Sequence, residues 1–215
     1  MIRKVFLLSI VFIGLSFLVS CGQRIGAEID IPEEIRVTVE SDMVGTYPTA
    51  EKVHFQDYQT LDNFVIVGVT FKDTAYQDAC YPDRFCIYVL APQADDFVIV
   101  YQTGDAYPAK QEEYAIFAWG FELEISGSPL ILVVDSVCVN NPNIKSLLLY
   151  EWDGRTQVFS IRENQGLFLY PRWNEGEHLQ QIEAFDQEGT YLGGYENRPP
   201  VLEFEIPCID LPTDE

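Results

Sequence analysis

The amino-acid sequence predicts an all-β protein of antiparallel strands, arranged as a sandwich, a barrel or propeller-like blades. Three observations predict this class. Short runs rich in Val, Ile and Phe recur along the chain, with turn residues between them. Asp153-Gly154 stands between two such runs and is a strong hairpin signal. Beyond residue 20, no apolar period of about 3.6 residues persists for the length of a typical helix.

The predicted strands are justified by their patterns in chain order. Ile35, Val37 and Val39 alternate with polar residues, which is typical of a half-buried strand. Residues 61–71 are almost continuously apolar, as in a strand buried on both faces. The later predicted strands are 85–90, 97–101, 114–125, 130–139, 146–152, 156–161, 167–170, 178–185, 190–193 and 201–206. Turns are expected at residues 92–96 and 186–189, and Gly120 is expected to mark a bulge.

The first twenty residues have the layout of a secretory signal helix. Arg3 and Lys4 form a positive start, and residues 5–19 are apolar but too few to cross a bilayer comfortably. The segment ends in Leu18-Val19-Ser20-Cys21, which resembles the lipobox of bacterial lipoproteins. The resemblance implies cleavage before Cys21, a diacylglyceryl group on its thiol and often an acylated amino terminus, such as a palmitate chain.

This resemblance sets the expected domain organisation and location. Residues 1–20 are the lipoprotein signal peptide, 21–34 a lipidated tether and 35–215 one all-β globular domain. Two or three acyl chains hold a protein to a bilayer far longer than a single myristoyl chain does. Gly22 replaces the aspartate that the family uses for retention at the inner membrane. The expected place is therefore the cell envelope, lipid-anchored on the extracytoplasmic side, and the outer membrane in a Gram-negative cell.

The charge of the chain excludes one class of partner. The sequence has 34 acidic and 13 basic residues, a formal net charge of −21 at pH 7. Such a surface repels nucleic-acid phosphates and anionic lipid head groups. The expected partners are the membrane, through the lipid, and an unknown protein or small ligand.

Four cysteines remain once Cys21 is set aside. An even number in an exported protein predicts disulfides, and four cysteines allow three pairings. We favour Cys80–Cys86, across a segment with turn character, and Cys138–Cys208, which would tie the C-terminal segment to an interior strand. No Cys-x-x-Cys pair is present and histidine is nearly absent, so we predict no metal site and no cofactor.

The sequence offers few candidates for catalysis. His54 and His178 are the only histidines, and there is no Gly-x-Ser-x-Gly elbow, His-Glu-x-x-His or phosphate-binding Gly-rich loop. We therefore assign no catalytic residue. Glu122 and Glu124 would share one face of a strand, where alternation predicts a solvated surface. Paired carboxylates of this kind leave a surface-anchored hydrolase acting on glycans as the alternative function.

A binding role is the first hypothesis, with residues 171–178 as its centre. Trp173 lies in a loop-like stretch, and an exposed tryptophan there would favour ligand binding. Glu175, Glu177 and His178 follow it and form the densest cluster of polar candidate ligands. They lack the spacing of a known calcium loop, so we predict a ligand contact and no metal.

A second resemblance concerns architecture alone. The course GSPLILVV…SLLLYEWDGRTQVFS is similar to a blade of the FG-GAP or VCBS-type β-propellers. An approximate internal echo supports it, since an apolar strand, a loop and a hairpin occur over 64–101 and again over 130–161. The acidic Asp-x-Asp-x-Asp-Gly loop of that family is missing, and the chain is too short for seven blades. No residue roles are carried over.

Overall fold

The computed structural model describes residues 29–75, 83–94, 96–106, 116–163, 165–196 and 208–209. This part of the chain forms one helix and three sheets of four strands each. The elements are α1 (Glu33–Thr46), β1 (Ala50–Leu61), β2 (Phe64–Asp73), β3 (Asp83–Gln93), β4 (Asp96–Ala106), β5 (Ile116–Ile125), β6 (Ile131–Val139), β7 (Ser146–Tyr150), β8 (Thr156–Ser160), β9 (Leu167–Asn174), β10 (Gln181–Phe185), β11 (Tyr191–Glu196) and β12 (Cys208–Ile209).

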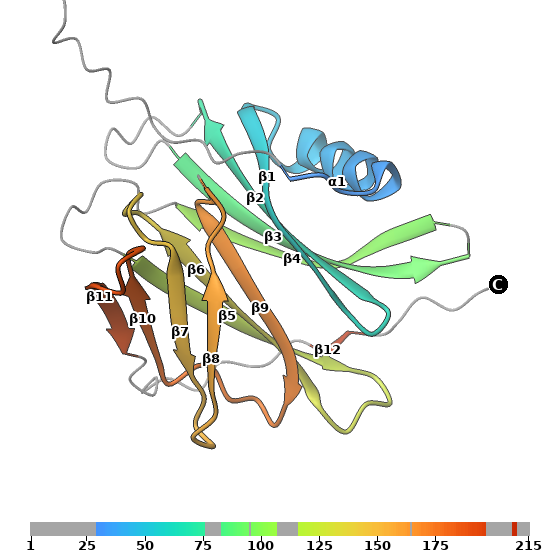
Figure 1. Ribbon diagram of the computed structural model, residues 1–215. Coiled ribbons are helices and arrows are strands. Elements are labelled where there is room, and N and C mark those ends of the chain that lie inside the picture. Colours follow the sequence, from blue (N-terminus) through green and yellow to red (C-terminus); the bar gives the residue numbers. More distant parts are fainter. Residues whose placement is uncertain are drawn as a thin grey trace, which may run out of the picture.

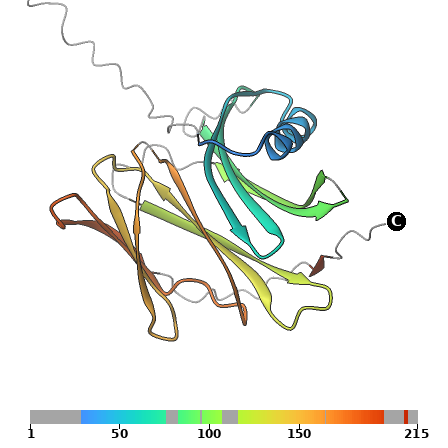
Figure 2. The same ribbon diagram turned by 45° about the vertical axis from the view of Figure 1, so that its right-hand side comes forward.

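The elements are stacked as four layers. The first sheet has the order β1-β2-β3-β4, the second β12-β5-β6-β9 and the third β11-β10-β7-β8. Helix α1 covers the outer face of the first sheet, and the second sheet lies between the other two (Figures 1 and 2). The all-β prediction is confirmed, and of the three architectures it allowed, the stacked sheets have that of a sandwich.

Three apolar clusters hold the layers together, one at each contact between neighbours. The cluster between α1 and the first sheet contains Val39 and Val67, and that between the first and second sheets contains Ile66 and Leu132. The cluster between the second and third sheets contains Leu147. Both faces of the first and second sheets are therefore buried, which explains why β2 and β6 are almost continuous apolar runs. The prediction that residues 61–71 contain a strand buried on both faces is confirmed for β2.

The strand predicted at Ile35, Val37 and Val39 is wrong, because these residues belong to α1. The helix buries Ile35, Val39 and Met43, four residues apart, while Val37 is 53% exposed. Residues four apart lie on one face of a helix, so this spacing was the decisive signal and the alternation was incidental. Ile31 joins the same cluster, so the folded domain also takes in residues from the predicted 21–34 tether.

Strand β1 was not predicted at all. Its sequence mixes His, Gln, Asp and Tyr with few β-branched residues, and its pairing with β2 is interrupted by two register shifts. One shift, between Phe55 and Asp57, turns the Asp57 side chain out of the regular pleat. Asp57 is thereby placed against β9 of the second sheet, where it joins the two sheets.

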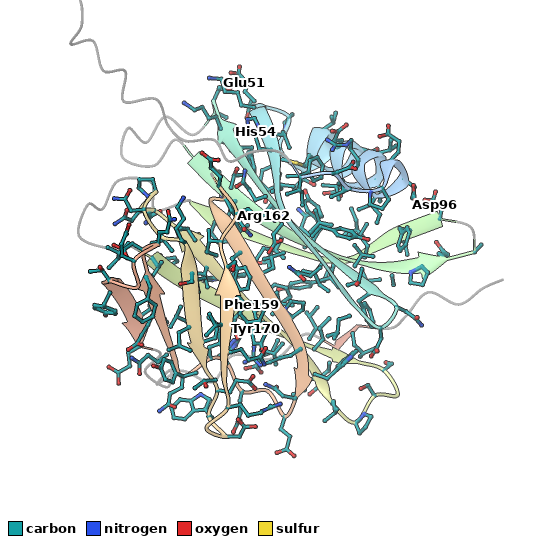
Figure 3. All side chains as sticks on the ribbon, viewed as in Figure 1. Glu51, His54, Asp96, Phe159, Arg162 and Tyr170 are labelled. Atoms are coloured by element: carbon teal, nitrogen blue, oxygen red, sulfur yellow. The ribbon has the colours of Figure 1, made fainter. Side chains whose placement is uncertain are left out.

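The contacts of Asp57 supply partners to the outer edge of β9. Its carboxylate accepts a hydrogen bond from the backbone N–H of Leu169 at 2.7 Å and from Arg162 Nη2 at 3.0 Å. The neighbouring Gln56 side chain accepts from the N–H of Gly166 at 2.9 Å. Arg162, labelled in Figure 3, also donates to the backbone carbonyl of Gln56 at 3.0 Å. Because β9 is an edge strand, these bonds satisfy backbone groups that no neighbouring strand reaches.

The predicted hairpins are confirmed where the structure describes them. β3 and β4 pair as far as Gln93 and Asp96, and β7 and β8 flank the turn at Gly154, whose φ is +85°. The turn at residues 186–189 joins β10 to β11. The strand predicted at 201–206 lies outside the described residues.

The internal echo is not a structural repeat. Strands β2, β3 and β4, from the first copy, lie side by side in one sheet. In the second copy β6 belongs to the second sheet, whereas the hairpin β7–β8 belongs to the third. The two segments therefore pack differently, and the likeness to a propeller blade does not extend to the arrangement of the strands.

The predicted disulfides are not found among the described residues. Cys86 and Cys138 are free and buried, and Cys80 lies outside the described part of the chain. Burial raises the pKa of the Cys86 thiol to about 11, and it raises that of Cys138 as well. Both thiols are therefore protonated and unreactive at neutral pH.

The backbone explains why Cys138 cannot pair with Cys208. Cys138 lies opposite Phe117 of β5, while Cys208 lies opposite Glu124, near the other end of the same strand. A strand rises about 3.3 Å per residue, so these positions are roughly 23 Å apart along β5. A disulfide requires Cα atoms within about 7 Å. Within the part that the structure describes, no helix has the length and apolar character needed to cross a membrane.

Candidate functional site

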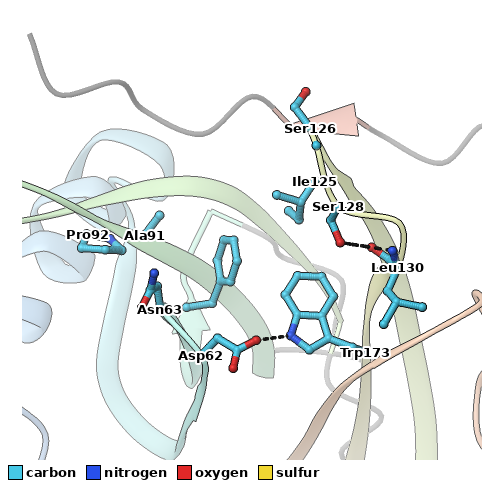
Figure 4. Close-up of a pocket in the computed structure, with 11 residues that line it drawn as sticks. Asp62, Asn63, Ala91, Pro92, Ile125, Ser126, Ser128, Leu130 and Trp173 are labelled. Atoms are coloured by element: carbon cyan, nitrogen blue, oxygen red, sulfur yellow. Dashed lines mark hydrogen bonds between the residues drawn. The ribbon is translucent and has the colours of Figure 1, made fainter.

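A pocket of about 550 Å³ lies at one end of the first and second sheets. Its walls are residues 62–64 of the β1–β2 hairpin, 91–92 near the end of β3, 125–128 and 130 of the β5–β6 connection, and Trp173 of β9. Figure 4 shows the indole of Trp173 between the β1–β2 turn and the β5–β6 turn. We call this the Trp173 pocket.

The Trp173 side chain is fixed by two contacts from the β1–β2 hairpin. Its indole Nε1 donates a hydrogen bond to Asp62 Oδ2 at 2.6 Å, drawn as a dashed line in Figure 4. Its ring meets the ring of Phe64 edge-on, with the centroids 5.9 Å apart. Asp62 has a φ of +51°, a conformation that aspartate tolerates better than most residues. A tight turn thus presents the carboxylate that orients the indole.

The prediction that Trp173 lies in a loop is wrong. It belongs to β9, pairs with Leu132 of β6 and is half-buried against the cluster between the first and second sheets. Pro171 favoured a loop in the sequence, but β9 is an edge strand, where proline is tolerated. The indole nevertheless lines the Trp173 pocket, so Trp173 remains a candidate for ligand binding.

His178 lies on the opposite face of the second sheet, within a network of charged side chains. Its Nδ1 is 2.8 Å from Asp135 Oδ1, and its Nε2 is 3.2 Å from Glu122 Oε1. The second oxygen of Asp135 accepts from Arg172 Nη1 at 2.5 Å and from the backbone N–H of Leu179. We call these four charged residues, Glu122, Asp135, Arg172 and His178, the His178 network.

The network determines the protonation of His178. Burial by itself lowers the pKa of the imidazole, but the hydrogen bond and charge of Asp135, with the charge of Glu122, outweigh it and raise the pKa above its usual value. Both ring nitrogens face carboxylates, and only the imidazolium can donate from both. Neither nitrogen is therefore placed to take a proton from a nucleophile, as a catalytic triad requires.

Gly120 makes room for this network. A Cβ atom at Gly120 would lie 2.6 Å from His178 Nδ1 and 2.8 Å from Asp135 Oδ1. The expectation that Gly120 marks a bulge is not met, since β5 and β6 pair in continuous register past it. Because glycine has no Cβ atom, the imidazole of His178 can pack directly over the backbone of β5.

The four residues predicted to bind ligand do not meet at one site. Trp173 faces the first sheet, whereas His178 is bonded to side chains on the other face of the second. Glu175 and Glu177 are exposed, and the backbone carbonyl of Glu177 accepts hydrogen bonds from the side chains of Arg172 and Asn174. Adjacent strand residues point to opposite faces, which separates Trp173 from the His178 network.

The sequence reasoning missed most of the pocket. It placed Asp62 and Asn63 inside a long predicted strand, although Asp and Asn are residues typical of turns. It also interpreted Glu122 as part of a solvated face, whereas this carboxylate is partly buried and bonded to His178. No group of metal-binding side chains is present among the described residues. Comparison of the chain with protein-family models, curated proteins and solved structures finds no match.

The His178 network predicts how stability depends on pH. A histidine whose pKa is raised by folding stabilises the protein fully below its unfolded pKa of about 6.5, and this stabilisation is lost as pH rises through the folded pKa. The free energy of unfolding, measured in urea from about pH 6 to about pH 9, should therefore fall. His178→Gln should flatten this fall. An equal slope in both proteins would contradict the prediction, since His54 is retained in each.

Proposed function

We propose that this protein is a bacterial envelope lipoprotein, anchored to the membrane through Cys21, whose β domain binds a ligand without transforming it. The observation that carries the binding role is the Trp173 pocket. Its volume of about 550 Å³ lies within the range of roughly 300–1,000 Å³ usual for small-molecule sites. Its indole is held in place before any ligand arrives, which lowers the entropic cost of binding.

The position of the pocket is compatible with an anchored domain. The backbone N–H of Ile29, the first described residue, donates to the carbonyl of Phe55, in the middle of β1. Asp62 lies just beyond the end of β1, seven residues after Phe55. At about 3.3 Å per residue, the pocket is roughly 20 Å along β1 from the contact with Ile29.

The alternative of a glycan hydrolase finds less support in the geometry. Hydrolysis of this kind normally requires two carboxylates that flank the scissile bond. The described residues that line the Trp173 pocket include a single carboxylate, Asp62, which is already bonded to the indole. The carboxylates of the His178 network are bonded to His178 and Arg172 on the other face of the sheet.

Replacing Cys21 tests the anchor. In a bacterial host fed labelled palmitate, we expect the wild-type protein to carry the label and to sediment with membranes. Cys21→Ala should lose the label entirely, because the acceptor thiol is gone. Cys80→Ala is the matched control and should remain labelled. Normal labelling of Cys21→Ala would remove the basis for the anchor.

A thermal-shift screen of neutral and charged small molecules tests the binding role. A ligand that binds only the folded protein raises its melting temperature. At least one compound should do so for the wild-type domain and much less for Trp173→Leu. A screen in which no compound stabilises the wild-type protein through this pocket would count against a ligand-binding function.

A further inference from the structure

The side chains that line the Trp173 pocket favour one class of ligand. Resting on the proposed binding function, we propose that it takes a neutral pyranose sugar, as a free saccharide or as a unit of a glycan. Three features of the pocket support this assignment: the aromatic surface presented by Trp173, the charge of the lining, and the hydrogen-bonding groups of the β1–β2 turn.

The indole presents an apolar surface to a ligand. Its one polar group, Nε1–H, already donates to Asp62 at 2.6 Å, which leaves the carbon surface of the ring for contact. The face of an aromatic ring carries partial negative charge. The C–H groups on one side of a pyranose ring carry partial positive charge and can stack on such a surface. Ile125 and Leu130 add further apolar wall.

The charge of the pocket excludes anionic ligands. Among the described residues that line it, Asp62 is the one ionisable side chain, and none is a lysine or arginine. A phosphate or carboxylate ligand would meet no opposite charge from these described residues and would be repelled by Asp62. The net charge of −21 over the whole chain also repels anionic ligands.

The turn supplies hydrogen-bonding groups of both kinds. The amide of Asn63 can donate and accept, and the carboxylate of Asp62 has acceptor capacity beyond its bond to the indole. Sugar hydroxyls also donate and accept, so they match this pair. A purely apolar ligand, such as an acyl chain, would bury these polar groups without partners, which costs free energy.

The experiment begins with a panel of neutral sugars. Glucose, galactose, mannose and N-acetylglucosamine are each titrated into the soluble domain, with intrinsic tryptophan fluorescence and calorimetry as readouts. At least one should bind in the millimolar range. Its 2-amino and uronic-acid derivatives then form a charge series on one ring. The uronic acid should bind about tenfold more weakly than the neutral sugar because it faces Asp62.

Substitutions at Trp173 and Asp62 separate the contribution of ring stacking to sugar binding from that of charge. Trp173→Leu should weaken binding of the neutral sugar about tenfold. Asp62→Asn keeps an acceptor for the indole but removes the charge, so the uronic acid should recover to nearly the affinity of the neutral sugar. Trp152→Phe removes a tryptophan that is 44% exposed, outside the pocket, and should bind as wild type does. If Trp173→Leu does not fold, Asn63→Ala, in the exposed turn, provides the second test and should weaken binding.

The possible outcomes separate this inference from the proposed function. Binding of other small molecules or of a peptide in the Trp173 pocket, with no sugar bound, would overturn the sugar assignment and leave the binding role intact. The absence of any ligand would overturn both. Equal affinity for the neutral sugar and its uronic acid would also overturn the assignment. Retention on an insoluble polysaccharide, with no free monosaccharide bound, would support a glycan unit as the source.

Discussion

Replacing Asp135 with alanine should lower the free energy of unfolding by about 3–5 kcal/mol, the largest effect that we expect of a single substitution in this protein. The carboxylate is buried and bonds Arg172 with one oxygen and His178 with the other. Its removal leaves the guanidinium of Arg172, whose side chain is 11% exposed, without its ion partner. Equilibrium unfolding in urea measures the loss.

Two further variants test whether the loss of stability comes from the buried charge of Asp135. Asp135→Asn keeps an acceptor for one partner but loses the charge, so its loss should be smaller than that of Asp135→Ala. Asp153→Asn removes a carboxylate that also bonds an arginine, Arg155, but on the exposed β7–β8 turn. Surface ion pairs contribute little, so this variant should unfold nearly as the wild type does. Equal losses for Asp135→Ala and Asp153→Asn would contradict the role assigned to burial.

Replacing Asp57 with alanine should cost about 2–3 kcal/mol, the second largest expected effect. The side chain is 3% exposed and joins β1 of the first sheet to β9 of the second. Without it, the buried N–H of Leu169 loses its acceptor, and Arg162 loses its ion partner. An unsatisfied buried donor is costly because water cannot replace the lost bond. Urea unfolding again provides the measurement.

Asp57→Asn distinguishes hydrogen bonding from charge at this position. Burial raises the pKa of the Asp57 carboxyl, while hydrogen bonds from Leu169 and Gln59 oppose the rise. The charged form is therefore costly there, and an amide that keeps an acceptor should lose much less stability than alanine. Amide hydrogen exchange at Leu169 should accelerate in Asp57→Ala. Slow exchange at Leu169 in that variant would show that another acceptor replaces the carboxylate.

Asp57 acts at a contact between two sheets, and Asp135 acts at a contact between the second sheet and the connection from β9 to β10. Neither contact could be predicted from local pattern. Asp57 and Leu169 are 112 residues apart, and Asp135 and His178 are 43 apart. Asp57 lies in a strand that was not predicted, and alternation assigned Glu122 and Glu124 to a solvated face. In a fold of stacked sheets, the second face of an interior sheet is covered as well, and acidic residues there need specific partners.

The candidate site illustrates the same limit. Trp173 and His178 were both singled out from the sequence, but their separation onto two faces follows from the start of β9 at Leu167 and its extension to Asn174. Pairing of β9 with β6 decides that extension, since Pro171 and Asn174 are residue types that strands disfavour. Asp62 became part of the site only because its turn lies over Trp173.

The sequence by itself determined the all-β class, the β3–β4, β7–β8 and β10–β11 hairpins and the strand buried on both faces, because turn residues and apolar runs act over a few neighbouring positions. It also carries the lipobox on which the proposed anchor rests. Only the tertiary structure decided that the helix at residues 33–46 packs on the first sheet, that Cys138 and Cys208 lie apart, and that a pocket forms beside Trp173. The physical reason is that each of these depends on how separate layers pack, and the energy of that packing comes from contacts between distant parts of the chain.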